Sequence, residues 1–505
     1  MRQKITVFFA FALLCAGAPA QVPNPILWLR ADSTGTDTPL WRDLSGNGYD
    51  AAFVSDSVKG ADTLMNFNPA FRFDGTTSLA VPPLTMSEQA NSVIIVYQAD
   101  TAAREELPLW SFLVDSIHTL ALTTRRIVNS RNTILYNEAN ESGAIVNCLT
   151  QPWRRRGLSD TLHCTGSVGH TDTSSFTGMV AELVVLPCGK AFSDTALIQW
   201  CSYLAVKYGV TLSETPYLSS DGTVTWPLDS LGPFSGSVIG IGRDDCFGLC
   251  QRQSRTADGL LTLALDSITA DNTLHGSVPA DREFLMLGTP AAALATSSEL
   301  YMEDDQTLSR YGDGLVRITG RGIRNSSTVL KIDASQWSDS LHHFALLVDR
   351  SGSGEYHYAD LEIFSPSEID TANKTLIFNN VQWDIDGNGY DRFCFATLPL
   401  LGLDSQIGER GTASEDDKGD GRDGAAGHYA LYPNPNNGHF VLEAQYPEAT
   451  PLTVYVYSTD GKAVRTYQRG NDTWHRVEGS ISAKGQYLIE IVSNAERNLI
   501  KMLVQ

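Results

Sequence analysis

The chain has 505 residues, which is more than one hydrophobic core usually holds, and this length predicts about three domains. Hydrophobic residues make up 42% of the sequence, so each domain can bury a core. The formal net charge of −21 argues against nucleic-acid binding, which needs a basic surface, and disfavours adhesion to anionic lipid.

The first 20 residues have the pattern of a secretory signal peptide. Arg2 and Lys4 precede an apolar run over residues 5–15, and Ala18-Pro19-Ala20 supplies the small residues of a cleavage site. No later stretch reaches the ~18 consecutive apolar residues of a membrane-spanning helix. We therefore expect an exported chain without a transmembrane span.

Residues 21–212 are predicted to form a β-sandwich that ends in a helix. Short apolar segments such as 93–97 and 182–186 alternate with Gly/Asn/Asp turns. The opening Leu27-Trp28-Leu29-Arg30-Ala31-Asp32 and the turn of residues 43–50 resemble the concanavalin A-like, laminin-G-like sandwiches of bacterial surface proteins. The resemblance implies a jelly roll, and we interpret the turn as structural rather than as a ligand site.

A helix is predicted from Ser193 or Asp194 to Tyr208, before Gly209. Its apolar stripe consists of Leu197, Trp200, Cys201, Leu204 and Tyr208. In the resembling family, a helix with the pattern Tyr-Leu-Ala-x-Lys-Tyr-Gly closes the sandwich and leads into the next module. This implies packing roles for Trp200 and Tyr208.

Two further regions precede the C-terminal domain. Residues 213–401 contain strand-like segments and resemble an uncharacterised β-rich module that follows such sandwiches in exported proteins, which implies no chemistry. Residues 402–427 are acidic, rich in glycine and almost free of apolar residues, as in a flexible linker.

Residues 428–505 are predicted to form a small immunoglobulin-like β-sandwich, because short alternating strands such as 452–457 are separated by tight turns. Its ordered motif residues are Tyr432, Pro433, Asn434, Pro435, Gly438, Asp460, Gly461, Lys462, Gly485 and Tyr487. This order resembles the type A sorting domain of type IX secretion in Bacteroidetes-type bacteria. The resemblance implies the type IX machinery as a partner, and a passage through the periplasm to the outer-membrane surface or the exterior.

The sequence contains no motif typical of a hydrolase active site. It has no Gly-x-Ser-x-Gly elbow and no His-Glu-x-x-His helix. Concanavalin A-like glycosidases place two glutamates on one strand, whereas the strand of residues 182–186 has Glu182 alone. We therefore predict a protein that is not an enzyme.

Carbohydrate binding would need aromatic platforms beside planar polar groups. Trp110, Trp153, Arg154 and Arg155 are the candidates for such a site in the sandwich. The alternative is that tryptophan anchors a loop on the core beside a solvated charge cluster.

A calcium site is predicted within Trp383–Asp391. The candidate ligands are Asp384, Asp386, Asn388, Asp391 and the carbonyl of Tyr390. The segment resembles the first half of an EF-hand or dockerin loop, although Phe395 stands where the bidentate glutamate should be. The alternative is a hairpin turn whose aspartates cap backbone amides. We expect no other cofactor.

Asp-Ser and Asp-Thr pairs followed by an apolar residue are similar to the O-glycosylation acceptor of exported proteins in the same bacterial group. The candidate acceptors are Ser57, Thr63, Ser116, Thr161, Ser230, Ser267, Ser340 and Thr371. The alternative is that these pairs are ordinary turns and caps.

Seven cysteines follow the signal peptide, and an odd number leaves at least one unpaired. Cys148 with Cys164 could join neighbouring strands, and Cys246 lies close to Cys250 in sequence. Sequence alone does not fix the pairing.

Three functions fit these patterns. We favour a secreted or cell-surface, non-catalytic protein for adhesion or carbohydrate binding, with a glycan or a host or cell-surface ligand. The alternatives are an extracellular polysaccharide hydrolase or lyase, and a structural component of the surface layer.

Overall fold

The structure is a computed structural model. It describes residues 22, 24–33, 40–54, 63–87, 90–100, 106–113, 119–129, 133–135, 143–151, 161–170, 174–188, 194–274, 278, 280–301, 307–337, 344–357, 360–364, 366–397, 428–434, 436–458, 463–493 and 497–504. The expected signal peptide and linker lie outside these residues.

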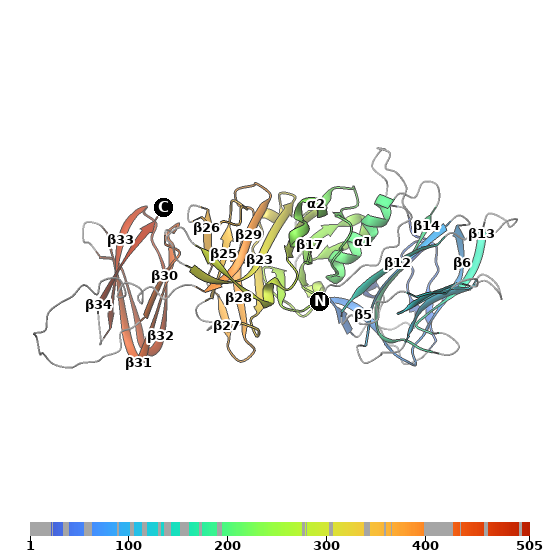
Figure 1. Cartoon of the computed structure of the whole chain (residues 1–505), viewed down its shortest axis with the longest axis horizontal. Coiled ribbons are helices and arrows are strands. Elements are labelled where there is room, and N and C mark those ends of the chain that lie inside the picture. Colours follow the sequence, from blue (N-terminus) through green and yellow to red (C-terminus); the bar gives the residue numbers. More distant parts are fainter. Residues whose placement is uncertain are drawn as a thin grey trace, which may run out of the picture. The chain divides into compact units, whose positions relative to one another are not determined.

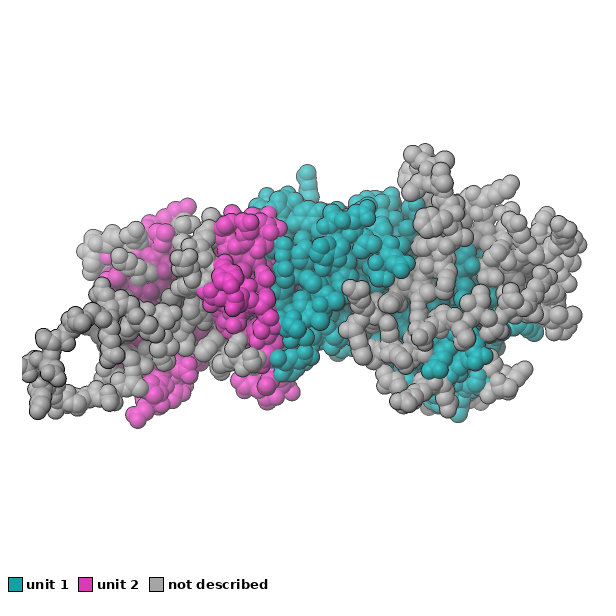
Figure 2. Space-filling view, in the orientation of Figure 1, with its two compact units in different colours: residues 1–296, 312–336, 375–392 teal, residues 297–311, 337–374, 393–505 magenta. Residues whose placement is uncertain are grey.

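The chain divides into two compact units (Figure 2). Unit 1 comprises residues 1–296, 312–336 and 375–392, and unit 2 comprises residues 297–311, 337–374 and 393–505. Strands dominate the described part of both units (Figure 1), as the sequence predicts.

The sandwich of unit 1 is built from two antiparallel sheets, within the part of residues 27–188 that the structure describes. The inner sheet has the order β12 (Ile145–Gln151), β7 (Ala90–Ala99), β14 (Thr177–Cys188), β5 (Asn68–Asp74) and β4 (Thr63–Met65), and β1 (Leu27–Arg30) also pairs with β14. The outer sheet has the order β11 (Thr133–Leu135), β10 (Arg126–Asn129), β9 (Thr119–Thr123), β8 (Pro108–Leu113), β13 (Thr161–Val168), β6 (Leu79–Ser87), β3 (Ala51–Phe53) and β2 (Leu40–Trp41). The short 3-10 helix η1 (Ala31–Ser33) follows β1.

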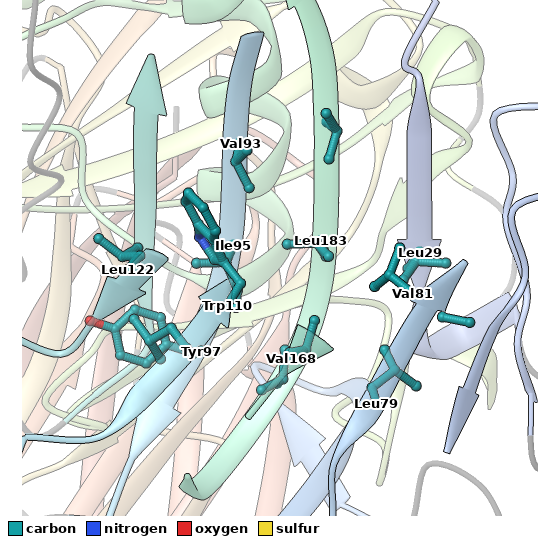
Figure 3. Packing of buried hydrophobic residues seen from close by; sticks show 14 of the residues in the cluster. Leu29, Leu79, Val81, Val93, Ile95, Tyr97, Trp110, Leu122, Val168 and Leu183 are labelled. Carbon is teal, nitrogen blue, oxygen red and sulfur yellow. The ribbon is translucent and has the colours of Figure 1, made fainter. Parts of the chain in front are cut away.

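One hydrophobic core joins the two sheets (Figure 3). Val93, Ile95 and Tyr97 from β7 meet Trp110 and Phe112 from β8 in this core. Because successive strand residues point to opposite sides, Ile94 and Val96 face away from it. They belong instead to a second core with helix α1 (Asp194–Tyr208). The inner sheet is therefore buried on both faces, which explains its continuous apolar runs.

Helix α1 confirms the helix expected from the sequence, but it is buried on more than one side. Leu197, Trp200 and Leu204 pack in the same core as Val184 of the inner sheet and Met286 of β21 (Glu283–Thr289). The helix therefore forms a layer between the sandwich and the β-rich module that follows.

The β-rich module contributes two sheets to unit 1, as far as the structure describes it. One contains β18 (Leu249–Gln251), β17 (Ser237–Asp244), β21 and β23 (Thr307–Thr319), and the other contains β19 (Gln253–Arg255), β20 (Leu261–Leu265), β24 (Thr328–Asp333) and β28 (Thr375–Val381). The smaller elements are β15 (Tyr217–Leu218), β16 (Val224–Trp226), α2 (Leu228–Leu231), η2 (Gly232–Phe234), η3 (Asp245–Phe247), η4 (Asn272–Leu274), η5 (Ala293–Ala295) and η6 (Ile323–Asn325).

Unit 2 contains further strands of this module. β22 (Ser297–Tyr301) pairs with the first residues of β23, and β25 (Phe344–Asp349) pairs with β26 (Leu361–Phe364). β27 (Glu368–Asp370) and the end of β29 (Tyr390–Thr397) also belong to unit 2.

The C-terminal domain, also in unit 2, is one folded sheet around its own core. Its strands are β30 (His428–Tyr432), β31 (His439–Ser458), β32 (Ala463–Ser480), β33 (Gly485–Ser493) and β34 (Arg497–Val504). The long β31 pairs with β30 in its first half and with β33 in its second, and its register with β32 shifts between Gln445 and Thr450. Such irregularities bend a strand, so two halves of one sheet can enclose a core.

The structure corrects the proposed cysteine pairs. Cys148 lies on β12 of the inner sheet and Cys164 on β13 of the outer sheet, so they do not occupy neighbouring strands. Cys246 and Cys250 are not joined to each other. Among the described residues, no helix is long and apolar enough to cross a membrane.

Candidate functional site

A buried cluster of charges lies between the inner sheet and α1. We define the buried charge cluster as Arg30, Asp32, Glu182 and Lys207 (all in unit 1). Leu27 and Leu29 of β1 point into the sandwich core, so the alternation of the strand directs Trp28 and Arg30 to the helix side. Arg30 is paired with Glu182 across the β1–β14 ladder.

Glu182 is fully buried and accepts hydrogen bonds from four side chains. Its Oε1 atom lies 2.6 Å from Trp28 Nε1 and 2.9 Å from the hydroxyl of Tyr203. Its Oε2 atom lies 3.1 Å from Lys207 Nζ and 2.9 Å from the hydroxyl of Tyr208. A buried carboxylate is tolerable only with such partners, so the strand and the helix specify each other.

Lys207 connects Glu182 to a second carboxylate. Its Nζ atom lies 3.0 Å from Asp32 Oδ2, and its side chain is only 3% exposed. Arg30 donates two hydrogen bonds to Asp32, from Nε to Oδ1 at 2.9 Å and from Nη2 to Oδ2 at 2.7 Å. Two cations therefore face two anions, and the cluster is neutral overall.

The local environment fixes the protonation of the groups around Glu182. Desolvation by burial raises the pKa of Tyr203 and of Tyr208 well above the ordinary value, so both phenols stay protonated and donate. Burial opposes ionisation of Asp32, but the charges of Lys207 and Arg30 outweigh it and hold the pKa of Asp32 far below its usual range.

A turn of the β-rich module, at Phe247 and Gly248, packs against the buried charge cluster. The Phe247 ring stacks on Tyr203, with centroids 4.9 Å apart, and Arg30 Nη1 donates to the Phe247 carbonyl at 2.9 Å. Gly248 follows with a φ of 56°, and a Cβ there would lie 3.0 Å from Arg30 Nη1. The cluster thus joins sandwich, helix and module.

A second polar network holds the end of α1. Asn66 and Phe67 form the β4–β5 turn with positive φ values of 46° and 65°. Asn66 Nδ2 and Asn68 Nδ2 both donate to the Lys207 carbonyl, at 3.0 and 2.6 Å. The turn therefore satisfies a carbonyl that the helix end leaves without an intrahelical partner.

Among the residues that the structure describes, three loops share the spacing Asp-x-x-Gly-x-Gly, beginning at Asp43, Asp349 and Asp384. Both glycines have positive φ in every loop. The Asp43 carboxylate accepts the amides of Trp28, Ser45 and Tyr49, and that of Asp349 accepts the amides of Ser351 and Gly354. The Asp43 loop is thus a structural turn, in agreement with its interpretation from sequence.

Hydrogen bonding affects the ionisation of Asp349. Burial opposes its charged form, but bonds from Ser351, Gly354 and Ser353 outweigh burial and lower the pKa of Asp349 below its usual value.

In the Asp384 loop the proposed calcium ligands are bound to protein groups. Asp384 Oδ1 accepts the Gly389 amide at 2.6 Å, and its Oδ2 lies 2.7 Å from Arg324 Nε. Asp391 Oδ2 accepts the Asp384 amide at 2.5 Å.

The other two proposed side-chain ligands are likewise engaged. Asp386 accepts the Asn388 amide at 3.2 Å, and Asn388 Oδ1 accepts the Tyr390 amide at 2.8 Å. No group of metal-ligating side chains suited to an ion occurs among the described residues. The geometry favours the amide-capping turn that the sequence left open as the alternative.

The proposed sugar-binding residues do not form a site in the described part of the chain. Trp110 is 1% exposed and lies in the sandwich core (Figure 3), because the alternation of β8 turns it inward. A buried indole cannot stack on a sugar, so Trp110 is corrected to a core residue. Trp153, Arg154 and Arg155 lie outside the described residues.

The candidate glycosylation acceptors differ in accessibility. Ser230, Ser267 and Thr371 are exposed, whereas Thr63 is half-buried and its Oγ1 lies 3.1 Å from Met179 Sδ. Thr161 begins β13. Ser57, Ser116 and Ser340 lie outside the described residues.

The asparagines of the C-terminal motif tie its first loop to the last strand. Asn434 Oδ1 accepts the Leu503 amide at 2.8 Å, and the Asn436 amide donates to the Leu503 carbonyl at 2.9 Å. Gly438 has a φ of 106°, and a Cβ there would lie 2.6 Å from the carbonyl oxygen of Ile481. Gly438 is therefore required by both conformation and space.

Other motif residues support the same domain. Tyr432 is buried, and Pro433 follows it through a cis peptide bond. Tyr487 is also buried and donates to the Ala483 carbonyl at 2.8 Å, two residues before Gly485. Pro435, Asp460, Gly461 and Lys462 lie outside the described residues.

Residues 430–505 match the family described as a secretion system C-terminal sorting domain. The C-terminal domain is a sorting domain. The protein is therefore exported by type IX secretion to the cell surface or the exterior, and the type IX machinery handles it.

Ahead of the sorting domain, residues 197–388 match a domain of unknown function, DUF8202. This match begins within α1, the helix that packs on both the sandwich and the β-rich module. Because the function of this family is unknown, the match implies no biochemical activity. No curated protein matches the chain.

Solved structures show only weak likeness. Domain 4 of AbnA, a GH43 extracellular arabinanase from Geobacillus stearothermophilus in complex with arabinotriose, is 13% identical with a TM-score of 0.23, over 33% of this chain and 94% of that chain. A family GH115 4-O-methyl-alpha-glucuronidase, BtGH115A, with specificity for decorated arabinogalactans, is 8% identical with a TM-score of 0.18, over 36% and 19%. The BSP domain of a biofilm associated protein is 10% identical with a TM-score of 0.14, over 86% and 80%. These scores are too low to support an argument.

The buried charge cluster was not predicted from sequence, although Arg30, Asp32 and Lys207 lie in the motifs quoted for the family resemblance. Arg30, Asp32 and Lys207 are charged residues inside apolar runs, and Glu182 interrupts a buried strand. Charges at such positions are a signal for buried pairs.

Proposed function

We propose that this exported protein is a non-catalytic surface protein whose N-terminal sandwich, of the concanavalin A-like type, binds glycans and so mediates adhesion. The sorting domain supports the surface location. The observation that carries the binding proposal is the difference between the two faces of the sandwich. The inner sheet is covered by α1, whereas the outward face of the outer sheet has exposed side chains.

A row of small side chains crosses that outward face. The strand registers place Ala52 beside Ala80, Ala80 beside Ser167, and Ser167 beside Ser111. Ala52 and Ala80 are exposed, and the hydroxyls of Ser167 and Ser111 lie 2.8 Å apart.

This surface has features that suit a sugar. Small side chains let a ligand approach the sheet closely, and Leu113, on β8 beyond Ser111, is 44% exposed and adds an apolar contact. Serine hydroxyls with a nearby apolar group fit the mixed polar and apolar surface of a sugar ring.

The test is a glycan array with the purified full-length chain. Ala80→Arg and Ser167→Arg place a long charged side chain on the row, and we expect each to weaken binding about tenfold or more, which corresponds to roughly 1.4 kcal/mol. The matched control is Ala270→Arg, at an exposed alanine of the β-rich module, which should bind as the wild type does.

Two results would contradict the proposal. Unchanged binding by both row variants would place the glycan site elsewhere, and release of reducing ends from a polysaccharide would show an enzyme.

A further inference from the structure

The buried charge cluster brings one amine into contact with two carboxylates. Lys207 Nζ is 3.0 Å from Asp32 Oδ2 and 3.1 Å from Glu182 Oε2. Lys207 lies in the last turn of α1, and Asp32 lies in the 3-10 turn after β1, so the contact joins distant parts of the chain. We propose that Lys207 and Asp32 condense into an intramolecular amide, with Glu182 transferring the protons.

Burial favours condensation over a simple ion pair. The side chains of Lys207 and Glu182 are 3% and 0% exposed, and that of Asp32 is 20% exposed. Aromatic rings enclose the amine, with Nζ 5.1 Å from the Tyr208 ring centroid and 5.6 Å from that of Tyr203. Little bulk water can reach the amide once it has formed, so hydrolysis is slow.

The fixed positions of the Lys207 amine and the Asp32 carboxylate also favour their condensation. Groups held within contact distance react as if at very high concentration, because the entropy of bringing them together is lost on folding. Here Tyr203 holds Nζ through a bond of 3.2 Å, and Arg30 holds both Asp32 oxygens.

The reaction balances without any added reagent. Glu182 Oε2 takes a proton from the Lys207 ammonium and passes it to Oδ2 of Asp32, and the free amine attacks Cγ of the neutral acid. The Nζ–Cγ bond forms, the Cγ–Oδ2 bond breaks, and Oδ2 leaves as water with two protons delivered through Glu182. An ammonium and a carboxylate thus become an amide and water, and neither atoms nor charge are left over.

Arg30 fits a supporting role in this step. Its two bonds to Asp32 place a positive charge where the oxygens of the tetrahedral intermediate become most negative. Once the amide has formed, Arg30 and Glu182 remain as the charged pair of the cluster. The product therefore leaves no isolated buried charge.

The experiment uses the full-length chain, denatured and measured by intact mass spectrometry. The expected mass is lower than that of the processed sequence by one water. Protease digestion should give a branched peptide that contains both Asp32 and Lys207, which identifies the bond whatever the processing of the ends.

Lys207→Arg keeps the positive charge but removes the nucleophile, so its mass should show no loss of water. Lys331→Arg, in β24, is the matched control and should lose one water as the wild type does. Glu182→Gln should stop or slow the reaction.

The wild-type chain alone decides the outcome, even if a variant fails to fold. A wild-type mass equal to that of the sequence, with Lys207 and Asp32 recovered in separate linear peptides, would show an ion pair only and would overturn the proposal.

Discussion

Glu182 is the residue on which the buried charge cluster depends. It accepts bonds from Trp28, Tyr203, Tyr208 and Lys207 with no solvent exposure. Removing one member of a buried ionic network leaves the others with uncompensated charge, whereas an exposed pair contributes little.

We predict that Glu182→Gln lowers the free energy of unfolding by about 3–5 kcal/mol, because the buried charge cluster is then left with one uncompensated positive charge. Urea unfolding followed by tryptophan fluorescence measures the change. Glu214→Gln, at an exposed glutamate, should change it by less than about 0.5 kcal/mol. Equal effects of the two substitutions would mean that Glu182 has no special role.

Individual residues show which structural roles could be predicted from the sequence and which could not. Trp200 and Tyr208 were predicted to be packing residues, and both are buried as expected. Trp110 was assigned to a binding surface, although the alternation of its own strand places it in the core. The Trp28–Glu182 contact joins residues 154 positions apart, and no local pattern encodes such a pair.

Among the elements, the three described Asp-x-x-Gly-x-Gly loops share a spacing and use their first aspartate in the same structural way. In each, a partly or fully buried aspartate accepts amide hydrogens of its own loop, and the glycines supply the positive φ values. The sequence predicted a calcium site from the aspartates of the third loop, but spacing alone does not distinguish a metal ligand from an amide acceptor.

We therefore predict the same melting temperature for the full-length chain in excess calcium and in chelator, since Arg324 and Gly389 already occupy the Asp384 carboxylate. Asp384→Ala should lower the melting temperature under both conditions, because it leaves Arg324 and the Gly389 amide without their partner. Asp386→Ala, at an exposed position, should have a smaller effect. A calcium-dependent rise that Asp384→Ala abolishes would instead establish the metal site.

The helix and the strands were predictable to different degrees. Caps and an apolar stripe located α1 within a residue or two. The same stripe did not reveal that the other sides of the helix are buried, because the β-rich module that covers them is formed by later sequence. A boundary after residue 212 therefore separates segments that share a core.

For the whole molecule, the sorting domain is the part that the sequence predicted most completely. Its motif positions are explained by the way Asn434, Asn436 and Gly438 fasten the first loop to later strands. The ligand of the sandwich could not be predicted, since a fold does not specify a function.

We predict that deleting residues 428–505 strands the protein in the periplasm, because this domain is what the type IX machinery handles. Cell fractionation and surface labelling with protease measure the distribution. Gly438→Val should act in the same direction, since its Cβ would lie 2.6 Å from the Ile481 carbonyl oxygen, and Gly470→Val is a control with open space around it. Surface exposure of the truncated chain would refute this assignment.

Because α1 covers the inner sheet, the sandwich cannot complete its folding until α1 has been synthesised. Protein synthesis proceeds from the N-terminus, so every sandwich strand emerges before α1. Until residues 194–208 follow, the face that carries Ile94, Val96 and Val184 stays open to water and to other nascent chains. The chain is therefore most prone to aggregate after the sandwich strands have been made and before α1 covers the inner sheet. A chaperone that shields the exposed sheet face would act during that interval.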